Sequence, residues 1–261
     1  MSGQRALSGY RDRNSTADRA LDVLLLFRDD KLVWTATEIA DGIGVARSTG
    51  YRYLQSLVNS GFIEESGNGF RLGPRIFMLA QLARASSSLS DIALPAMNSL
   101  AEKFRETVLL TRRSGRSVVC LDLVESAHVV RLSYERGHVL PINAGAAAEA
   151  LLAWAPQDEV TELLATAPLE RFTPRTITDP AELQERLAQI RKDGVAVSQG
   201  ELDDQILGVA APIHDSKGAV VAAISIAAVA SRIPSRELKS VRTAVRNAAI
   251  SVSEQLAAVN Y

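Results

Sequence analysis

The chain has 261 residues, of which 47% are hydrophobic and 23% are charged, and its formal net charge is −1. This length favours two domains, and the composition is that of a folded globular chain, which excludes an intrinsically disordered protein. No run of about 18 uncharged apolar residues could span a bilayer, and the first 20 residues lack the apolar stretch of a secretory signal. We therefore expect a cytoplasmic protein with no membrane partner.

Basic residues are concentrated at the start of the chain. Residues 1–87 hold eleven lysines and arginines against nine acidic residues, a net charge of +2, whereas residues 88–261 carry a net charge of −3. A positive first third is expected of a domain that binds nucleic acid, although many other domains carry a small positive charge. The asymmetry favours nucleic-acid binding there without establishing it.

Two helices are predicted near the N-terminus, after a flexible arm over residues 1–14. From Ser15 an acidic residue follows three positions on and apolar residues recur at helical spacing, which predicts a first helix over residues 15–27. Its apolar face would hold Ala17, Ala20, Leu21 and Leu24. A capping-box pattern at residues 35–38 then begins a short second helix that Gly42 ends.

A third helix and a hairpin complete the first predicted domain. A tight turn at residues 44–49 leads into a helix that runs to about Asn59 and stops at Gly61. Residues 62–65 and 70–72 are typical of two strands joined by a glycine-rich turn. A helix-turn-helix followed by such a hairpin indicates a winged helix-turn-helix domain that binds DNA, and we place it at residues 15–73.

The third helix has an apolar side and a hydrogen-bonding side. At 100° per residue, Gly50, Leu57 and Val58 cluster around Leu54, and polar side chains cluster opposite them. No acidic residue lies between Asp41 and Glu64 to offset the local arginines. Because arginine, glutamine and short hydroxyls suit base edges and phosphates in a major groove, we expect DNA contacts from Arg47, Ser48, Thr49, Tyr51, Arg52 and Gln55. The alternative is an ordinary solvated helix surface.

Residues 74–88 are predicted to form a linker helix. Pro74 suits the first position of a helix, and the serines at 86–88 loosen the chain after it. An apolar stripe runs along this helix through Ile76, Leu79, Ala80 and Ala83. A partner helix from a second subunit could cover the stripe, which favours a dimer, although packing within one chain is the alternative.

The remainder of the chain, residues 89–261, predicts a second and larger domain. Strand pairs alternate with helices, which is typical of an α+β fold with an antiparallel sheet covered by helices. The expected strands are residues 107–111, 117–123, 128–132, 208–214 and 219–227. The expected helices are residues 92–105, 147–152, 158–166, 180–193 and 235–258.

Signals for catalysis or metal binding are not found in the sequence. It contains no G-x-S-x-G, H-E-x-x-H, Walker or paired-cysteine motif, and His128, His138 and His214 do not have the spacing of metal ligands. The single cysteine, Cys120, lies in an apolar run and is predicted to be a buried core residue. We therefore expect no enzyme, no cofactor and no metal. Two alternatives stay open: a catalytic constellation of distant residues, and a large domain that only dimerises.

The order and spacing of several segments resemble the IclR family of transcriptional regulators. In the first third, these segments are Thr35–Ala40, Arg47–Leu54, Gly61–Ile63 and Phe70–Gly73. In the larger domain they are Leu140–Gly145, Ala150–Ala153, Gly194–Ser198, Glu201–Asp203, Gly208–Ile213 and Ala222–Ile226. No single segment is diagnostic, but together they cover nearly the whole chain from about Ser15.

The resemblance implies a function and a set of ligand-binding residues. It implies a GAF-like effector-binding domain, an operator DNA as partner, a homodimer or a dimer of dimers, and control of catabolic or stress genes by a small, often acidic metabolite. We expect a repressor, and an activator is the alternative that stays open. Matched position by position, the effector pocket would be lined by Leu132, Leu140, Ala146, Ala147, Ser198, Ile206, Gly208, Ser225 and Ala227.

Several positions depart from the usual pattern of the family. Asn143 stands where histidine is common, Ala148-Glu149 where Gly-Lys is common, Ser198 where aspartate is common, and Ala227 where some members have a second serine. These departures leave Ser225 and backbone N–H groups as the main polar groups of the pocket. Because a buried polar group without a partner costs about 1–3 kcal/mol, a short, densely polar acid should bind less well than a ligand with an apolar body and one polar end.

We therefore expect an aromatic or medium-length aliphatic carboxylate as the effector. The alternative is that Leu132, Leu140 and Ser225 are ordinary core residues of a filled interior, since most apolar positions in any domain belong to the core.

Overall fold

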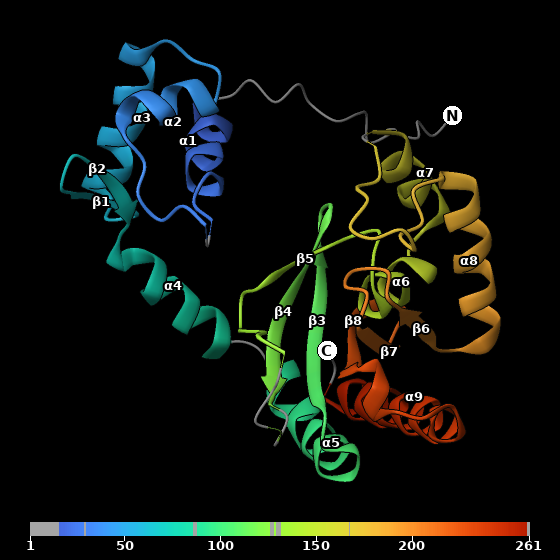
Figure 1. The fold of residues 1–261 in the computed structure, drawn as a ribbon. Helices are drawn as coiled ribbons and strands as arrows, with labels where there is room; N and C mark the ends of the chain where they lie inside the picture. The colour runs from blue at the N-terminus through green and yellow to red at the C-terminus, as the bar shows by residue number, and fades with distance from the viewer. Residues whose placement is uncertain are drawn as a thin grey trace, which may run out of the picture. The chain divides into compact units, whose positions relative to one another are not determined.

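The computed structural model describes residues 16–28, 30–85, 88–125, 128, 132–166 and 168–259 (Figure 1). The chain forms two compact units, residues 1–86 and 87–261, which are described separately below. The predicted flexible arm over residues 1–14 lies outside the described residues. Among the helices that are described, none is long and apolar enough to cross a membrane.

The first unit has the predicted winged helix-turn-helix fold. Its elements in chain order are α1 (Thr16–Leu25), α2 (Ala36–Gly42), α3 (Arg47–Asn59), β1 (Ile63–Ser66), β2 (Gly69–Leu72) and α4 (Pro74–Ala85). The strands β1 and β2 form an antiparallel hairpin, and the backbone of Trp34 pairs with Phe70 at its edge. The predicted capping box is formed: the Thr35 N–H donates to Glu38 Oε2 at 2.9 Å, and the Glu38 N–H donates to Thr35 Oγ1 at 3.3 Å.

The buried face of α1 differs from the predicted one. Val23 is fully buried in the core of this unit, whereas Ala17 and Leu21 are exposed. Because residues 23–27 are all apolar, periodicity alone does not decide which side of the helix faces the core. Packing against Ile39, Leu54 and Leu57 of the neighbouring helices decides it.

The second unit is an α+β fold built on a six-stranded antiparallel sheet in the order β5-β4-β3-β8-β7-β6. The strands are β3 (Thr107–Ser114), β4 (Ser117–Val124), β5 (Val139–Pro141), β6 (Ala196–Gln199), β7 (Ile206–His214) and β8 (Val220–Val229). The helices are α5 (Ser88–Phe104), α6 (Ala146–Ala153), α7 (Gln157–Thr166), α8 (Pro180–Asp193) and α9 (Ser235–Ala258), with a 3-10 turn at Ala230–Arg232.

The predicted cover of helices over the sheet is confirmed, and the structure shows helices on both of its faces. The long helices α5 and α9 pack on one face, in a core that alternate residues of β3, β7 and β8 share. The helices α6, α7 and α8 pack on the other face. Figure 1 shows this division, with α5 and α9 together on one side of the strands. The predicted core position of Cys120 is confirmed, since its side chain is buried.

The two edge strands were not predicted. We expected a strand over residues 128–132, but neither His128 nor Leu132 belongs to a strand, and residues 129–131 lie outside the described residues. The edge strands are instead β5 and β6. They have only three and four residues, and they include proline, alanine and serine, which give little β signal in a sequence.

Candidate functional site

The recognition-type helix α3 is held close to α2 by a small residue. Gly50 is buried, and a Cβ atom at this position would lie 3.0 Å from the Ala40 Cβ atom. The turn between the two helices contains Gly44, whose φ of +67° suits glycine. Gly50, Leu54 and Leu57 therefore face the core, and the opposite side of α3 is left to solvent.

The predicted DNA-contacting residues lie together on the exposed part of this helix. Arg47, Ser48, Tyr51, Arg52 and Gln55 are exposed, and Thr49 is half-buried. Within the described residues, the side chains of Arg47 and Arg52 make no ion pair or hydrogen bond. A shallow groove beside them is lined by Thr16, Thr49, Arg52, Tyr53, Gln55, Ser56 and Asn59. This surface combines free cationic and amide groups, which suit phosphate and base contacts.

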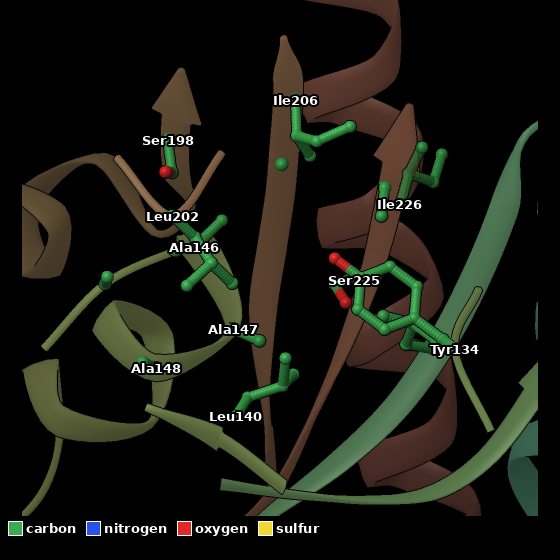
Figure 2. A pocket seen from close by; sticks show the side chains of 15 residues that line it. Tyr134, Leu140, Ala146, Ala147, Ala148, Ser198, Leu202, Ile206, Ser225 and Ile226 are labelled. Carbon is green, nitrogen blue, oxygen red and sulfur yellow. The ribbon is translucent and has the colours of Figure 1, made fainter. Parts of the chain in front are cut away.

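The second unit contains a cavity on the sheet face that α6 covers (Figure 2). Its empty space, including the opening, is about 490 Å³. The lining residues are Leu109, Tyr134, Leu140, Ala144, Gly145, Ala146, Ala147, Ala148, Ser198, Leu202, Ile206, Gly208, Ser225, Ile226 and Ala227. They include all the residues predicted for the pocket except Leu132, which packs against the cluster of Leu109, Cys120, Leu123 and Ala227 beside it.

Strand register explains why distant residues meet here. Ser198 pairs with Gly208, and Gly208 pairs with Ala227, so these three form one row across β6, β7 and β8. Ser225 lies two residues before Ala227 on β8 and so points to the same face. The helix α6 closes the cavity because Gly208 has no side chain: a Cβ atom there would lie 3.1 Å from the Ala146 Cβ atom and 3.5 Å from the Ala146 nitrogen.

Polar groups without partners line this mostly apolar cavity. Ser198 and Ser225 are only 4% and 3% exposed, and neither hydroxyl makes a hydrogen bond within the part of the chain that the structure describes. The first N–H groups of a helix have no intrahelical acceptor, and the residue that precedes α6, Gly145, has no side chain to cap them. Since a helix N-terminus attracts anions, the cavity can hold an acidic group.

Sequence reasoning missed Tyr134, whose ring lies at this cavity (Figure 2). Burial, and then the negative charge of Asp203, raise the pKa of Tyr134. Its hydroxyl therefore stays protonated at neutral pH and can donate a hydrogen bond. Tyr134 lies in a loop before the Leu140-Pro141 turn, and tyrosine combines an apolar ring with a polar hydroxyl. These two features together could have marked it as a candidate pocket residue.

A buried ion pair that the sequence did not predict joins α6, whose first residues line the cavity, to α8. Glu149 of α6 is 2% exposed, and Arg186 of α8 donates to both of its carboxylate oxygens, with Nε to Oε1 at 3.1 Å and Nη2 to Oε2 at 3.2 Å. Arg186 also donates to the carbonyl oxygen of Val197, the neighbour of Ser198. Burial and the charge of Glu201 together outweigh Arg186 and raise the pKa of Glu149 to about 7. The pair ties α6 to the strand that carries Ser198.

Two family models match the chain. The IclR helix-turn-helix domain matches residues 16–67, and the C-terminal domain of the bacterial transcriptional regulator IclR matches residues 81–254. The transcriptional repressor IclR of Escherichia coli is 32% identical over 241 residues, which cover 87% of this chain and 88% of the relative. This relative is a transcriptional regulator rather than an enzyme, which confirms the non-enzymatic interpretation of the sequence.

Solved structures agree with these matches. An IclR-type transcriptional regulator from Silicibacter has a TM-score of 0.85 and 30% identity, covering 93% of this chain and 96% of its own. An IclR homologue from Microbacterium hydrocarbonoxydans, solved in complex with 4-hydroxybenzoate, has a TM-score of 0.75 and 28% identity. That match covers 94% of this chain and 100% of the homologue.

Replacement of Arg52 by alanine is expected to weaken DNA binding without unfolding the protein, because Arg52 is exposed on α3. A lost base contact should cost about 1–3 kcal/mol and relax sequence specificity, whereas a lost phosphate contact should weaken all sequences alike and flatten the salt dependence. Fluorescence anisotropy with operator and random DNA at several salt concentrations separates the two. Arg236→Ala, at an exposed arginine of α9, is the matched control. Unchanged affinity of Arg52→Ala for both DNAs would contradict the assignment.

Replacement of Glu149 by glutamine is expected to alter how stability depends on pH. The folded-state pKa of Glu149, about 7, exceeds the ordinary value of 4.5, so between these values the folded state binds more protons and the wild-type free energy of unfolding falls as pH rises. Because the variant has no carboxyl group at this position, its free energy of unfolding should rise relative to that of the wild type as the pH increases from 4.5 to 7. The expected relative gain is on the order of 3 kcal/mol. Urea denaturation from pH 5 to 8 measures the difference, with the exposed Glu102→Gln as control. A difference that stays constant over this range would refute the prediction.

Proposed function

The chain belongs to the IclR family of bacterial transcriptional regulators, and from this we propose that it is a cytoplasmic repressor whose affinity for its operator changes when a small effector enters the cavity. The observation that carries the proposal is the presence, in one chain, of an exposed cationic recognition helix and of an apolar cavity lined by Ser198 and Ser225, whose hydroxyls have no partner among the described residues. In this proposal, residues 15–73 form the DNA-binding domain, residues 74–88 form the linker helix, and residues 89–261 form the effector-binding domain.

DNA contact is assigned to the exposed side of α3. The proposed residues are Arg47, Ser48, Thr49, Tyr51, Arg52 and Gln55. Their exposure and the absence of any acidic residue between Asp41 and Glu64 support this assignment. Within the described part of the chain neither Arg47 nor Arg52 pairs with a carboxylate, so both guanidinium groups are available to phosphates or base edges.

The linker helix α4 supports a dimer. Phe77 and Leu82 are 73% and 64% exposed, and Met78 and Leu79 are also exposed. Of the predicted stripe, Ile76 is half-buried and Ala80 is exposed, while the Ala83 side chain lies outside the described residues. An exposed apolar helix of this kind marks an interaction surface, and a second copy of α4 related by two-fold symmetry would cover it. Two recognition helices would then read an inverted repeat.

The double variant Phe77→Ser with Leu82→Ser is expected to dissociate the dimer. Each dimer would lose four buried apolar side chains, each worth roughly 1.5–3 kcal/mol, or about 6–12 kcal/mol in all, so its dissociation constant should rise by about 10,000-fold or more. Sedimentation at micromolar concentration, with and without DNA, measures the mass, and Leu25→Ser, at another exposed leucine, is the control. A monomeric wild-type mass under both conditions would rule out the dimer.

The effector is proposed to be a carboxylate with an aromatic or medium-length aliphatic body. Leu140, Ile206 and Ala227 offer apolar surface for the body, and Leu132 packs against the cluster that contains Ala227. The α6 N-terminus and the Ser225 hydroxyl offer hydrogen bonds to the acid. The remaining proposed contacts come from Ala146, Ala147, Ser198 and Gly208. The homologue solved with 4-hydroxybenzoate, an aromatic carboxylate, supports this ligand class.

Calorimetric titration of wild type and Ser225→Ala tests the ligand class. Benzoate and hexanoate should bind wild type more tightly than glyoxylate does, and Ser225→Ala should weaken the carboxylates that bind by about 1 kcal/mol, or roughly fivefold. Ser240→Ala, at an exposed serine of α9, is the control. Tighter binding of glyoxylate, or indifference of every ligand to Ser225→Ala, would overturn the assignment. A domain that only oligomerises would bind none of them and would show no ligand-dependent rise in thermal stability.

A further inference from the structure

We propose that a rigid joint between α3 and α4 sets the spacing at which the two half-sites of the operator are bound, and that Gly73 and Arg75 are the positioning residues of this joint. The inference rests on the dimer proposed above, because it describes how a pair of α4 helices would hold two recognition helices. Its basis is the contact between residues 60–63 and residues 73–75, all of which belong to the first unit.

The segment that ends α3 is hydrogen-bonded directly to the start of α4. The Gly73 N–H donates to the Phe62 carbonyl oxygen at 2.8 Å, and the Arg75 N–H donates to the Gly61 carbonyl oxygen at 3.1 Å. The first N–H groups of a helix have no acceptor within the helix, so α4 takes one of its acceptors from the end of α3. The Arg75 side chain adds a third bond, from Nε to the Ser60 carbonyl oxygen at 3.2 Å.

A side chain at position 73 would not fit between the two segments. Gly73 is buried, and a Cβ atom there would lie 2.4 Å from the Gly61 carbonyl oxygen and 3.1 Å from the carbonyl carbons of Gly61 and Ile63. These are backbone atoms, which cannot rotate away as the end of a flexible side chain can. The joint is therefore held by backbone packing as well as by hydrogen bonds, and the direction of α4 relative to α3 is fixed.

The proposed dimer contact lies on the helix that this joint holds. The exposed apolar residues of α4 begin at Phe77, two residues after Arg75. Because each joint ties one α3 to its own α4, a two-fold pair of α4 helices would fix the distance and the angle between two α3 helices. Recognition helices held in this way fit half-sites at one centre-to-centre spacing.

A change of spacing is a large change for a rigid dimer. One extra base pair moves a half-site by about 3.4 Å along the DNA and turns it by about 35° around the axis. The complex can follow this change only if the DNA deforms, which costs free energy, or if the joint gives way. The dependence of affinity on spacing therefore reports the stiffness of the joint.

The test measures DNA affinity of the full chain as a function of half-site spacing, by fluorescence anisotropy. An inverted repeat is selected from random DNA with the wild type and is then resynthesised with one base pair removed or added between its halves. Wild type is expected to lose about tenfold or more in affinity on either change. In Gly73→Ala this preference should fall to about twofold or less, because a joint that is forced open lets each α3 follow its half-site.

Arg75→Ala is the second variant, and it keeps the test decisive if Gly73→Ala does not fold. Its spacing preference should fall by about threefold, because adapting the joint then breaks one hydrogen bond fewer in each subunit. Gly67→Asn, in the turn of the hairpin, is the matched control, since a Cβ atom there meets nothing within 4 Å and asparagine tolerates its φ of +61°. It should keep the wild-type preference. Thermal unfolding and sedimentation check that each variant is a folded dimer.

The opposite results would overturn the inference. A wild-type dimer that binds all three spacings equally would show that the joint is not rigid. If folded, dimeric variants keep the full preference, another part of the chain sets the spacing. If a variant loses the same factor at every spacing, its residue contacts DNA or supports the fold and does not position α3. In these three cases the proposed dimer still stands, whereas a monomeric wild type would remove the dimer and this inference with it.

Discussion

The cavity exists because one helix end rests directly on a sheet residue that has no side chain. Gly208 lets the backbone of Ala146 approach the central strand β7, and this brings the uncapped N-terminus of α6 against the face that carries Ser198 and Ser225. Any larger residue at position 208 would push α6 outward, since the missing Cβ atom would already lie 3.1 Å from the Ala146 Cβ atom. The Glu149–Arg186 pair then ties the same helix to β6.

A similar close approach shapes the DNA-binding unit. Gly50 brings α3 against Ala40 of α2, and the capping box of Thr35 and Glu38 fixes where α2 begins. Together they orient α3 so that its apolar residues are buried and Arg52 and Gln55 face outward. In both units a glycine sets the position of the helix that presents the functional groups. Effector binding in the cavity can change the affinity for the operator only if the two binding sites are energetically coupled.

Local signals in the sequence predicted much of this architecture. The helices predicted over residues 180–193 and 235–258 are confirmed as α8 and α9, and in the structure Asp179 caps the start of α8 and Gly194 ends it. The two faces of α3 follow from helical periodicity. The resemblance to a known family supplied the expected pocket residues. Strand register explains why residues as far apart as Ser198 and Ser225 line one cavity, and the close approach of Gly208 adds Ala146 of α6.

Features that depend on contacts between distant segments could not be predicted. The partnership of Glu149 with Arg186 joins residues 37 positions apart. Glu149 was visible in the sequence only as a departure from the family pattern, and nothing in the sequence pointed to Arg186 as its partner. Tyr134 belongs to a loop whose course no periodicity describes. The buried face of α1 and the short edge strands β5 and β6 are also set by packing rather than by local pattern.

The most direct test of effector-controlled DNA binding is a pair of affinities measured on the full chain: operator binding with and without saturating carboxylate, and carboxylate binding with and without operator. Because coupling between two sites is reciprocal, both affinities should change by the same factor, typically about 5- to 150-fold. An operator affinity that does not change at saturating ligand would contradict effector control, even if the ligand binds tightly.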